Sequence, residues 1–394
     1  MDRFHSSAAV VACTALALCA LTQSVKMVNV AGAGGSALMA DAGGLGERAL
    51  AVRVKGGPGT WIRHMICTRS DCMHRGKVVE LDLGSGEPAA LCVGRELGRG
   101  GEGAVFKATL FRPASDAADS DSEAVHAAAE QHCRLERGWA RLRRKRDAKA
   151  AADIPVRQTR IAVKEETGSA DALPVEAEFL NALNKKAHGP YIEFYGYDPL
   201  HNLLLMQYVR HDLHYVLTGR RREVSLALAI TWTDELLTGL AALHEECWAH
   251  RDIKPESLLV HCGGEGSCKL LIGDVGIGCR LPRWQCTPKA SWGTARTVLH
   301  IEACDRGMGW SPGYEPPELG RDDYDARKHD VYSAGVVLGY MLNKVGTAAR
   351  ELPGYDSLLV LQREMTEREP GRRCWAAQCQ SRWRRKLMQL YPTI

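Results

Sequence analysis

The sequence predicts an α+β protein with two lobes, in which strands come first and helices follow. Apolar and polar residues alternate over 77–83 and again over 90–97, which is the period-two pattern of half-buried strands. Over 226–243 the apolar residues recur at helical spacing instead, and Ser225 stands where an N-cap would begin that helix. We therefore expect a β-sheet lobe followed by a mainly helical lobe.

Composition places the chain among ordinary globular proteins. Of its 394 residues, 45% are hydrophobic and 25% are charged, which excludes wholesale disorder and a fibrous repeat. Lys and Arg number 51 against 47 for Asp and Glu, and a net charge of only +4 argues against nucleic acid as a partner. No apolar run reaches the roughly 18 residues of a membrane-spanning helix. We expect a soluble monomer.

The first 24 residues are typical of a secretory signal peptide. The apolar run 8–21 suits the hydrophobic region of a signal better than a membrane anchor, because it is only 14 residues long. The segment 25–75 is interpreted as an N-terminal extension, and its first part, 25–48, is rich in Gly, Ala and Ser as flexible leaders are. The alternative is an apolar N-terminus on a cytosolic protein.

Cysteine usage supports the secretory prediction. Of 14 cysteines, twelve remain once Cys13 and Cys19 are removed with the signal, and several are close pairs of the kind that form disulfides in oxidising compartments. These pairs are Cys67 with Cys72, Cys262 with Cys268, Cys279 with Cys286, and Cys374 with Cys379. For the isolated cysteines the alternative is a buried free thiol, and these are Cys92, Cys133, Cys247 and Cys304. A zinc site is an alternative for His64, Cys67, Cys72 and His74, although their spacing matches no common zinc pattern.

A glycine-rich turn joins two predicted strands. Within the run 97–105, Gly98, Gly100 and Gly103 have G-x-G-x-x-G spacing. Glycines let the backbone turn tightly and aim its N–H groups at phosphate oxygens. A dinucleotide-binding turn of this spacing opens into a helix, whereas residues 104–111 have the pattern of another strand. The motif predicts a hairpin lid over phosphates.

Further motifs follow this turn in order. They are Ile161-Ala162-Val163-Lys164, Glu176 on a helical stretch, Leu203 to Val209, His250-Arg251-Asp252-Ile253-Lys254-Pro255-Glu256, Gly273-Asp274-Val275-Gly276, Gly313-Tyr314-Glu315-Pro316-Pro317-Glu318, Asp330-Val331-Tyr332-Ser333 and Arg373. Each alone has an ordinary interpretation, such as a solvated lysine or a turn acid. Together, in this order and spacing, they resemble the protein kinase family.

This resemblance implies a two-lobed protein-kinase fold. The implied N-lobe is an antiparallel β-sheet with helix C, over residues 76–209 with an inserted segment 112–160, and the mainly helical C-lobe covers 210–394. It also implies that Arg373 pairs with Glu318.

The chemistry implied by the resemblance is phosphoryl transfer from ATP with Mg²⁺ to a protein substrate. Lys164, held by Glu176, would orient the nucleotide, and Asp274 would ligate Mg²⁺. Asp252 would accept or orient the substrate hydroxyl proton, and Lys254 would steady the transferred group, as in serine/threonine kinases. The nucleotide-binding residues would be Leu97, Gly98, Gly100, Gly103, Val105, Ala162, Lys164, Met206 as gatekeeper, Gln207, Tyr208 and Leu259.

Three residues depart from the family's pattern. Ser257 stands where an Asn would ligate a second Mg²⁺, and a hydroxyl is a weaker ligand than an amide carbonyl. Glu102 at the tip of the glycine-rich turn would repel phosphates, and Val275 removes the bulk of a Phe from packing against His250 and Leu180. We expect an active kinase, and the alternative is a pseudokinase that grips another protein.

The segment 274–318 is long and contains four candidate phosphorylation sites. They are Thr287, Ser291, Thr294 and Thr297. In the family that this chain resembles, an Arg at the position of Arg251 is the usual partner of a phosphorylated residue in that segment.

One subfamily fits particularly well. Gly313-Tyr314-Glu315-Pro316-Pro317-Glu318 resembles the G-[FY]-E-P-P-E-L form of the secreted rhoptry kinases of apicomplexan parasites. The predicted signal peptide, the many cysteines, the N-terminal extension and the closing run Leu390 to Thr393 agree with that family. This resemblance implies a secretory, rhoptry or host-cell location.

The insert 112–160 replaces an expected short hairpin turn. Its part from Ser115 to Glu123 is acidic and rich in Ser, and is predicted to be disordered. Its part 133–150 is a predicted basic amphipathic helix, which suits contact with an anionic membrane surface or an acidic partner. The alternative is a solvated surface helix, and the basic run Arg382 to Lys386 has the same two interpretations.

Overall fold

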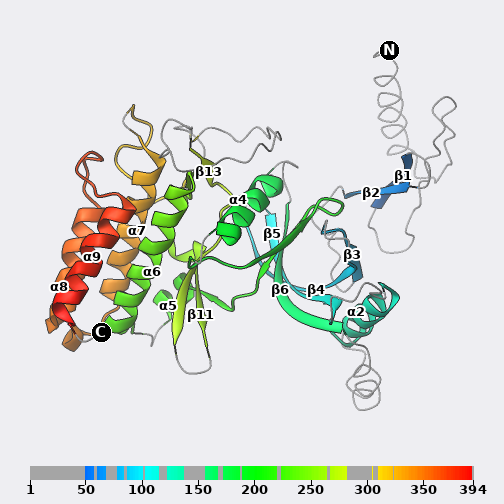
Figure 1. The fold of residues 1–394 in the computed structure, drawn as a ribbon, viewed down its shortest axis with the longest axis horizontal. Helices are drawn as coiled ribbons and strands as arrows, with labels where there is room; N and C mark the ends of the chain where they lie inside the picture. The colour runs from blue at the N-terminus through cyan, green and yellow to red at the C-terminus, as the bar shows by residue number, and fades with distance from the viewer. Residues whose placement is uncertain are drawn as a thin grey trace. The chain divides into compact units, whose positions relative to one another are not determined.

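The computed structural model has the predicted α+β composition (Figure 1). It describes residues 49–56, 60–67, 78–83, 87–100, 103–114, 122–136, 156–166, 172–186, 189–219, 223–263, 267–281, 304, 309–322 and 324–392. The predicted signal peptide, Glu102 and the four candidate phosphorylation sites lie outside these residues, and so do the cysteine and histidine of the suggested zinc group at positions 72 and 74.

Two compact units make up the chain. The first comprises residues 1–82, 86–94 and 111–156, and the second comprises residues 83–85, 95–110 and 157–394. The predicted lobe boundary at residue 209 stays a prediction.

The first unit contains a strand pair and a helix held by a disulfide. β1 (Ala49–Gly56) and β2 (Thr60–Cys67) pair antiparallel within the predicted N-terminal extension. α2 (Ser122–Glu136), which belongs to the predicted insert, packs against β3 (Val78–Leu81). The core beneath α2 consists of Ala90, Cys92, Phe111, Val125, Ala129 and Cys133. Most of the predicted basic helix 133–150 lies outside the described residues.

A six-stranded sheet has the strand order β3-β4-β5-β6-β8-β7. Its remaining strands are β4 (Ala89–Arg99), β5 (Gly103–Pro113), β6 (Val156–Glu166), β7 (Phe194–Asp198) and β8 (Leu203–Gln207). β6 and β8 run antiparallel with Ala162 opposite Met206, and the run 161–164 is buried on both faces. This central, buried placement suits a strand that presents a single cation, Lys164, at a site.

Six helices of more than one turn form most of the rest of the described chain. They are α4 (Ala172–Lys186), α5 (Leu213–Thr218), α6 (Leu226–Glu245), α7 (Ala326–Asn343), α8 (Pro353–Met365) and α9 (Ala376–Leu390). Ser225 caps α6 as predicted, because its hydroxyl accepts a hydrogen bond from the Leu228 amide at 3.2 Å. α6 is long and apolar enough to span a membrane, but it packs against α7 and α9 in the core (Figure 1).

Short strands and turns connect these helices and carry the motifs. β9 (His211–Asp212), β11 (Leu258–Cys262) and β12 (Cys268–Ile272) form a three-stranded sheet. β10 (Trp248–Ala249) pairs with β13 (Cys279–Arg280). Two 3₁₀ turns, η2 (Pro255–Ser257) and η4 (Thr347–Glu351), complete the described elements.

The disulfides confirm some of the predicted pairings and correct others. Cys262–Cys268 and Cys374–Cys379 form as predicted. The predicted pair Cys279–Cys286 is wrong, since Cys279 is bonded to Cys304. The four isolated cysteines are not free thiols either: Cys92 is bonded to Cys133, Cys304 to Cys279, and Cys247 is also in a disulfide. Pairing by sequence proximity fails here because the fold, and not chain distance, brings these sulfur atoms together.

Candidate active site

The structure brings Lys164, Glu176 and Asp274 together. Lys164 Nζ lies 2.7 Å from Glu176 Oε2 and 3.7 Å from Asp274 Oδ1. The Lys164 and Glu176 side chains are almost fully buried, whereas that of Asp274 is 49% exposed. The buried ion pair with Glu176 thus fixes the position of the Lys164 ammonium group, and the Asp274 carboxylate remains accessible to a ligand.

The glycine-rich turn is closely packed at only one of its described glycines. A side chain at Gly103 would meet the carbonyl oxygen of Glu165 at 2.3 Å, and φ there is +158°. Nothing lies within 4 Å of such a position at Gly98 or Gly100. Gly103 is therefore needed for strand packing, while the other two leave open space that a phosphate-bearing ligand can occupy.

The predicted adenine-binding residues lie on β4, β5, β6, β8 and β11, except for Tyr208, which directly follows β8. Ala162 and Met206 face each other across the β6–β8 ladder and are 7% and 8% exposed. Half-buried positions are occupied by Val105, Gln207, Tyr208 and Leu259, and Leu97 is exposed. Because Ala162 is small and the Met206 side chain is flexible, this pair leaves room for the planar adenine ring.

The motif 250–256, which is called the catalytic loop below, forms a compact polar cluster. Lys254 Nζ donates to Asp252 Oδ2 and, at 2.8 Å, to Ser311 Oγ. Ser311 Oγ in turn donates to Asp252 Oδ1 at 2.7 Å. Both oxygens of Asp252 are therefore held in a fixed orientation, as a group that must receive a proton at one position requires.

Ser311 contacts both Asp252 and Lys254 but is not among the site residues that the sequence predicts. It lies 59 residues after Asp252 in the chain, within the half-exposed run before Glu318. The sequence signal that could have identified it is a hydroxyl residue two positions before Gly313, the first residue of the G-Y-E-P-P-E motif.

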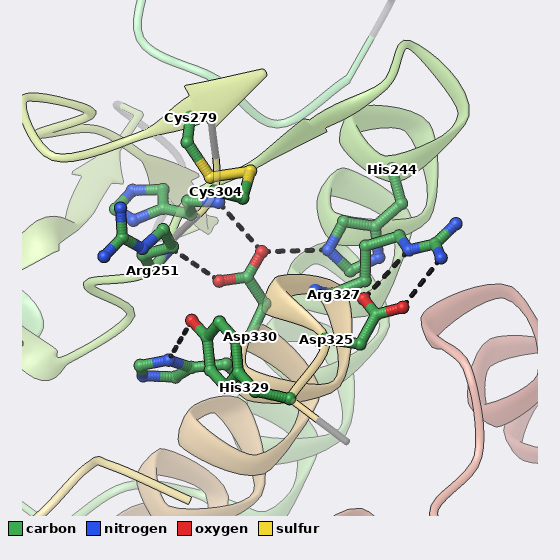
Figure 2. Close-up of a disulfide and its surroundings, with 10 residues drawn as sticks. His244, Arg251, Cys279, Cys304, Asp325, Arg327, His329 and Asp330 are labelled. Carbon is green, nitrogen blue, oxygen red and sulfur yellow. Dashed lines mark hydrogen bonds and ion pairs between the residues drawn. A yellow bond between two sulfur atoms is a disulfide. The ribbon is translucent and has the colours of Figure 1, made fainter. Parts of the chain in front are cut away.

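Asp330 anchors the catalytic loop from the helical side (Figure 2). Its carboxylate accepts the backbone N–H groups of His250 at 2.8 Å and Arg251 at 2.7 Å, and contacts His244 Nε2 at 2.9 Å. Burial raises the pKa of Asp330, but the hydrogen bond and charge of His244 and the contacts from His250 outweigh it, so the pKa lies below its usual value. Arg251 has φ +67°, a conformation that these hydrogen bonds stabilise.

Two further contacts join the catalytic loop to the Asp274 turn. His250 Nε2 lies 2.9 Å from the Gly273 carbonyl oxygen, and the Gly273 amide donates to the Ser257 carbonyl oxygen at 2.9 Å. Asp274 itself has φ +53°, so its carboxylate leaves the β12 direction sharply. The two acidic groups, Asp252 and Asp274, are thus carried by loops that are fastened to each other.

Ser257 is enclosed within its own loop. Its side chain is fully buried, and its Oγ accepts the Lys254 amide at 3.0 Å and lies 2.8 Å from the Asp252 carbonyl oxygen. A hydroxyl enclosed by the backbone of its own loop has no exposed surface for a cation. These contacts give Ser257 a structural role in its own loop, and its role as a metal ligand stays a prediction.

We predict that Ser257→Ala lowers the turnover number without changing the Mg²⁺ dependence of nucleotide binding. The substitution leaves the buried Lys254 amide without its acceptor, which costs about 1–3 kcal/mol and loosens the loop. Magnesium titrations of ATP-induced thermal stabilisation, compared with Ser357→Ala on α8, test this expectation. A large rise in the Mg²⁺ requirement of Ser257→Ala alone would support the metal-ligand role.

Val275 is buried in a core that also contains an aromatic residue of helix α4. Val275 is 2% exposed, and Phe179 of α4 lies over Gly278, where a side chain would meet the Phe179 ring at 2.1 Å. Phe179 also stacks on Trp248, with ring centroids 4.3 Å apart. Val275 and Phe179 belong to the same buried cluster, so an aromatic ring of α4 contributes to the core in which Val275 lies.

The donor set fits Mg²⁺ and ATP. Asp274 offers a half-exposed carboxylate of the type that Mg²⁺ prefers, beside a lysine whose charge suits phosphate oxygens. The open space at Gly98 and Gly100 is on the turn that the sequence places over phosphates. Asp274 would hold the ion and Lys164 the phosphates.

A family comparison matches this geometry. The model of the family described as "Protein kinase domain" matches residues 144–352, more than half of the chain. The chain belongs to the protein kinase family. The match includes Lys164, Asp252 and Asp274, and the predicted two-lobed kinase fold is confirmed, whereas the glycine-rich turn precedes the matched range.

Three curated kinases show the same similarity over shorter lengths. Serine/threonine-protein kinase srb10 of Schizosaccharomyces pombe is 33% identical over 147 residues, covering 35% of this chain and 34% of that protein. Serine/threonine-protein kinase mos of Gallus gallus is 28% identical over 151 residues, covering 34% and 38%, and human STK11 is 34% identical over 109 residues, covering 26% and 20%. The matched part spans less than two fifths of each relative.

Proposed function

We propose that this kinase transfers the γ-phosphoryl group of ATP to serine and threonine hydroxyls of proteins. The observation that carries the proposal is the pair of clusters in one compact unit: Lys164 with Glu176 and Asp274, and Asp252 with Lys254 and Ser311. The first cluster suits nucleotide phosphates, and the second suits an incoming hydroxyl.

Each residue has a defined task in this proposal. Lys164 neutralises phosphate charge, and its pairing with Glu176 keeps its ammonium group in one position. Bound Mg²⁺ would supply further charge neutralisation at Asp274. Asp252 receives or orients the proton of the substrate hydroxyl, while Lys254 stabilises negative charge on the transferred group.

Serine and threonine are the proposed acceptors on two grounds. Lys254 follows Asp252 by two positions, the form of the motif that resembles serine/threonine kinases. The curated relatives reported above are named as serine/threonine kinases.

A pseudokinase that binds a protein partner is the second candidate. It is favoured by Ser257, because a buried hydroxyl stands where a second metal ligand would be expected. Asp274 is then the metal-ligand candidate that remains among the predicted site residues, and one carboxylate neutralises phosphate charge less completely.

We further propose that the chain is a secreted kinase similar to the rhoptry kinases. The G-Y-E-P-P-E motif, the predicted signal peptide and the disulfides among the described residues support this proposal, since disulfides persist in oxidising compartments. Localisation of the tagged full-length chain in its own cell tests it, and a purely cytosolic signal would contradict it.

The kinase proposal is tested by a transfer assay and a binding assay on the same samples. With radiolabelled ATP, Mg²⁺ and a basic protein substrate, the wild type should label serine and threonine. ATP with Mg²⁺ should also raise its melting temperature. At a ligand concentration of 100 Kd, the free energy of unfolding should rise by about 2.7 kcal/mol. Lys164→Ala and Asp274→Ala should lose both effects, because each removes a phosphate or metal contact.

The exposed Lys185→Ala on α4 is the matched control and should behave as the wild type. Stabilisation by nucleotide without any transfer would support the pseudokinase instead. A nucleotide shift that survives both site substitutions would contradict the proposed site.

A further inference from the structure

A disulfide closes the segment that brings Ser311 to the catalytic loop. This segment, 274–318, leaves the Asp274 turn and returns to place Ser311 on Asp252. Cys279 near its beginning is bonded to Cys304, seven residues before Ser311. The crosslink therefore ties the chain to β13 at a point seven residues before Ser311.

The crosslink is attached to the strand beside the catalytic loop. Cys279 in β13 pairs with Ala249 in β10, and β10 continues directly into His250 and Arg251. Cys279 is 2% exposed and belongs to a small buried cluster with Cys247, Ala249, Leu281 and Ala326. Figure 2 shows the disulfide beside Arg251 and Asp330, which anchors the loop.

The residues that follow Ser311, up to Glu318, are held by contacts of their own. The Tyr314 carbonyl oxygen accepts a hydrogen bond from Ser333 Oγ of α7 at 2.7 Å, and the Glu318 carboxylate is bound by Arg373 in the core. With Cys304 bonded on one side and Tyr314 bonded on the other, Ser311 is positioned from both directions.

Arg251 is buried within the fold. Its side chain is 5% exposed and hydrogen-bonds with Tyr324, whose pKa burial raises to about 12. Tyr324 OH also lies 3.0 Å from His329 Nδ1. The arginine that would otherwise bind a phosphorylated residue is thus buried against Tyr324, next to the crosslink.

We propose that the Cys279–Cys304 disulfide is a positioning element for catalysis, which holds Ser311 on Asp252 and Lys254 without a phosphate on the 274–318 segment. This inference rests on the proposed kinase activity. Opening the bridge frees the incoming side of the segment, so the Ser311 contacts to the catalytic pair are made only part of the time. Nucleotide contacts at Lys164 do not depend on it.

The test compares paired substitutions in the full chain, because a reductant would open the other disulfides as well. Cys279→Ser with Cys304→Ser removes this bridge, and Cys262→Ser with Cys268→Ser removes the bridge of the β11–β12 hairpin as the matched control. Cys304→Ser alone opens the same bridge while it leaves the buried Cys279 side chain in place, in case the pair does not fold.

The two variants without the Cys279–Cys304 disulfide, called the bridge variants, are expected to have a kcat at least tenfold below that of the wild type. Their KM for ATP should be unchanged within twofold, and the control variant should have a kcat and KM near those of the wild type. Hydrogen exchange of the amides over 309–314 should speed up only in the bridge variants. Phosphatase treatment of the wild type, checked by intact mass, should leave kcat unchanged.

Two results would overturn the inference: equal exchange over 309–314 in bridge and control variants, or loss of wild-type activity after phosphatase treatment. Hydrogen exchange decides the placement even if the wild type transfers no phosphate. In that case the proposed function fails, and faster exchange still establishes that the disulfide holds the segment.

Discussion

Replacing Asp252 with Asn is expected to lower kcat for phosphoryl transfer by about 10²–10⁴-fold, the usual contribution of a positioned proton acceptor. An amide has nearly the same shape as the carboxylate but is neither a useful base nor a negative partner for Lys254. Ser311 donates to one Asp252 oxygen and Lys254 donates to the other, so part of this orientation is lost as well. Because Lys164 and Asp274 are untouched, the KM for ATP should change little.

Steady-state kinetics with a radiolabelled product measure this effect, with Asp234→Asn as the control. Asp234 is a partly exposed acid on α6 that pairs with Arg384, away from the catalytic loop. A kcat for Asp252→Asn within threefold of the wild type would show that transfer does not use this loop. Equal loss in both variants would indicate unfolding and would be visible in their melting curves.

The sequence predicts best what local chemistry determines. The strands predicted over 77–83 and 90–97 and the Ser225 cap follow from the preferences of neighbouring residues, and the structure contains β3, β4 and the cap. The expected alternation fails in β4, because residues 89–93 are all buried. The pairing of Arg373 with Glu318 came only from the resemblance to the kinase family, yet the structure confirms it.

The sequence predicts less well what distant segments determine together. Cys92 and Cys133 are 41 residues apart, and Cys279 and Cys304 are 25 apart, so their bonding depends on a helix packing on a sheet and on a segment folding back. Proximity along the chain favoured Cys286 for Cys279, and this was wrong because β13 carries Cys279 toward Cys304.

The candidate site shows the same division. Lys164, Glu176 and Asp274 meet as the motif order implies, since each motif type has a fixed place in the kinase fold. Ser257 fits its motif position but its side chain turns into its own loop, which depends on the direction of one χ angle and not on residue type. The orientation of a single side chain is determined by its packing in the folded protein.

Arg373→Ala is expected to destabilise the folded chain by about 3–5 kcal/mol, because it leaves the Glu318 carboxylate buried and unpaired. Both side chains are fully buried, and Arg373 Nη2 lies 3.0 Å from Glu318 Oε2. Arg373 also donates to the carbonyl oxygens of Glu367 and Lys328, so its loss leaves these two acceptors without that donor.

Arg384→Ala on α9 is the matched control, since Arg384 also binds a carboxylate through two nitrogens, at 2.8 and 2.9 Å from Asp234, but is half-exposed. An exposed pair contributes about 0–1 kcal/mol, so the two substitutions should differ by several kcal/mol in urea unfolding. The double variant Glu318→Leu with Arg373→Met should recover much of the loss, because no buried charge remains unpaired. If Arg373→Ala destabilised no more than Arg384→Ala, water would have to reach Glu318, and the buried pair would not hold the end of the 274–318 segment against the helical lobe.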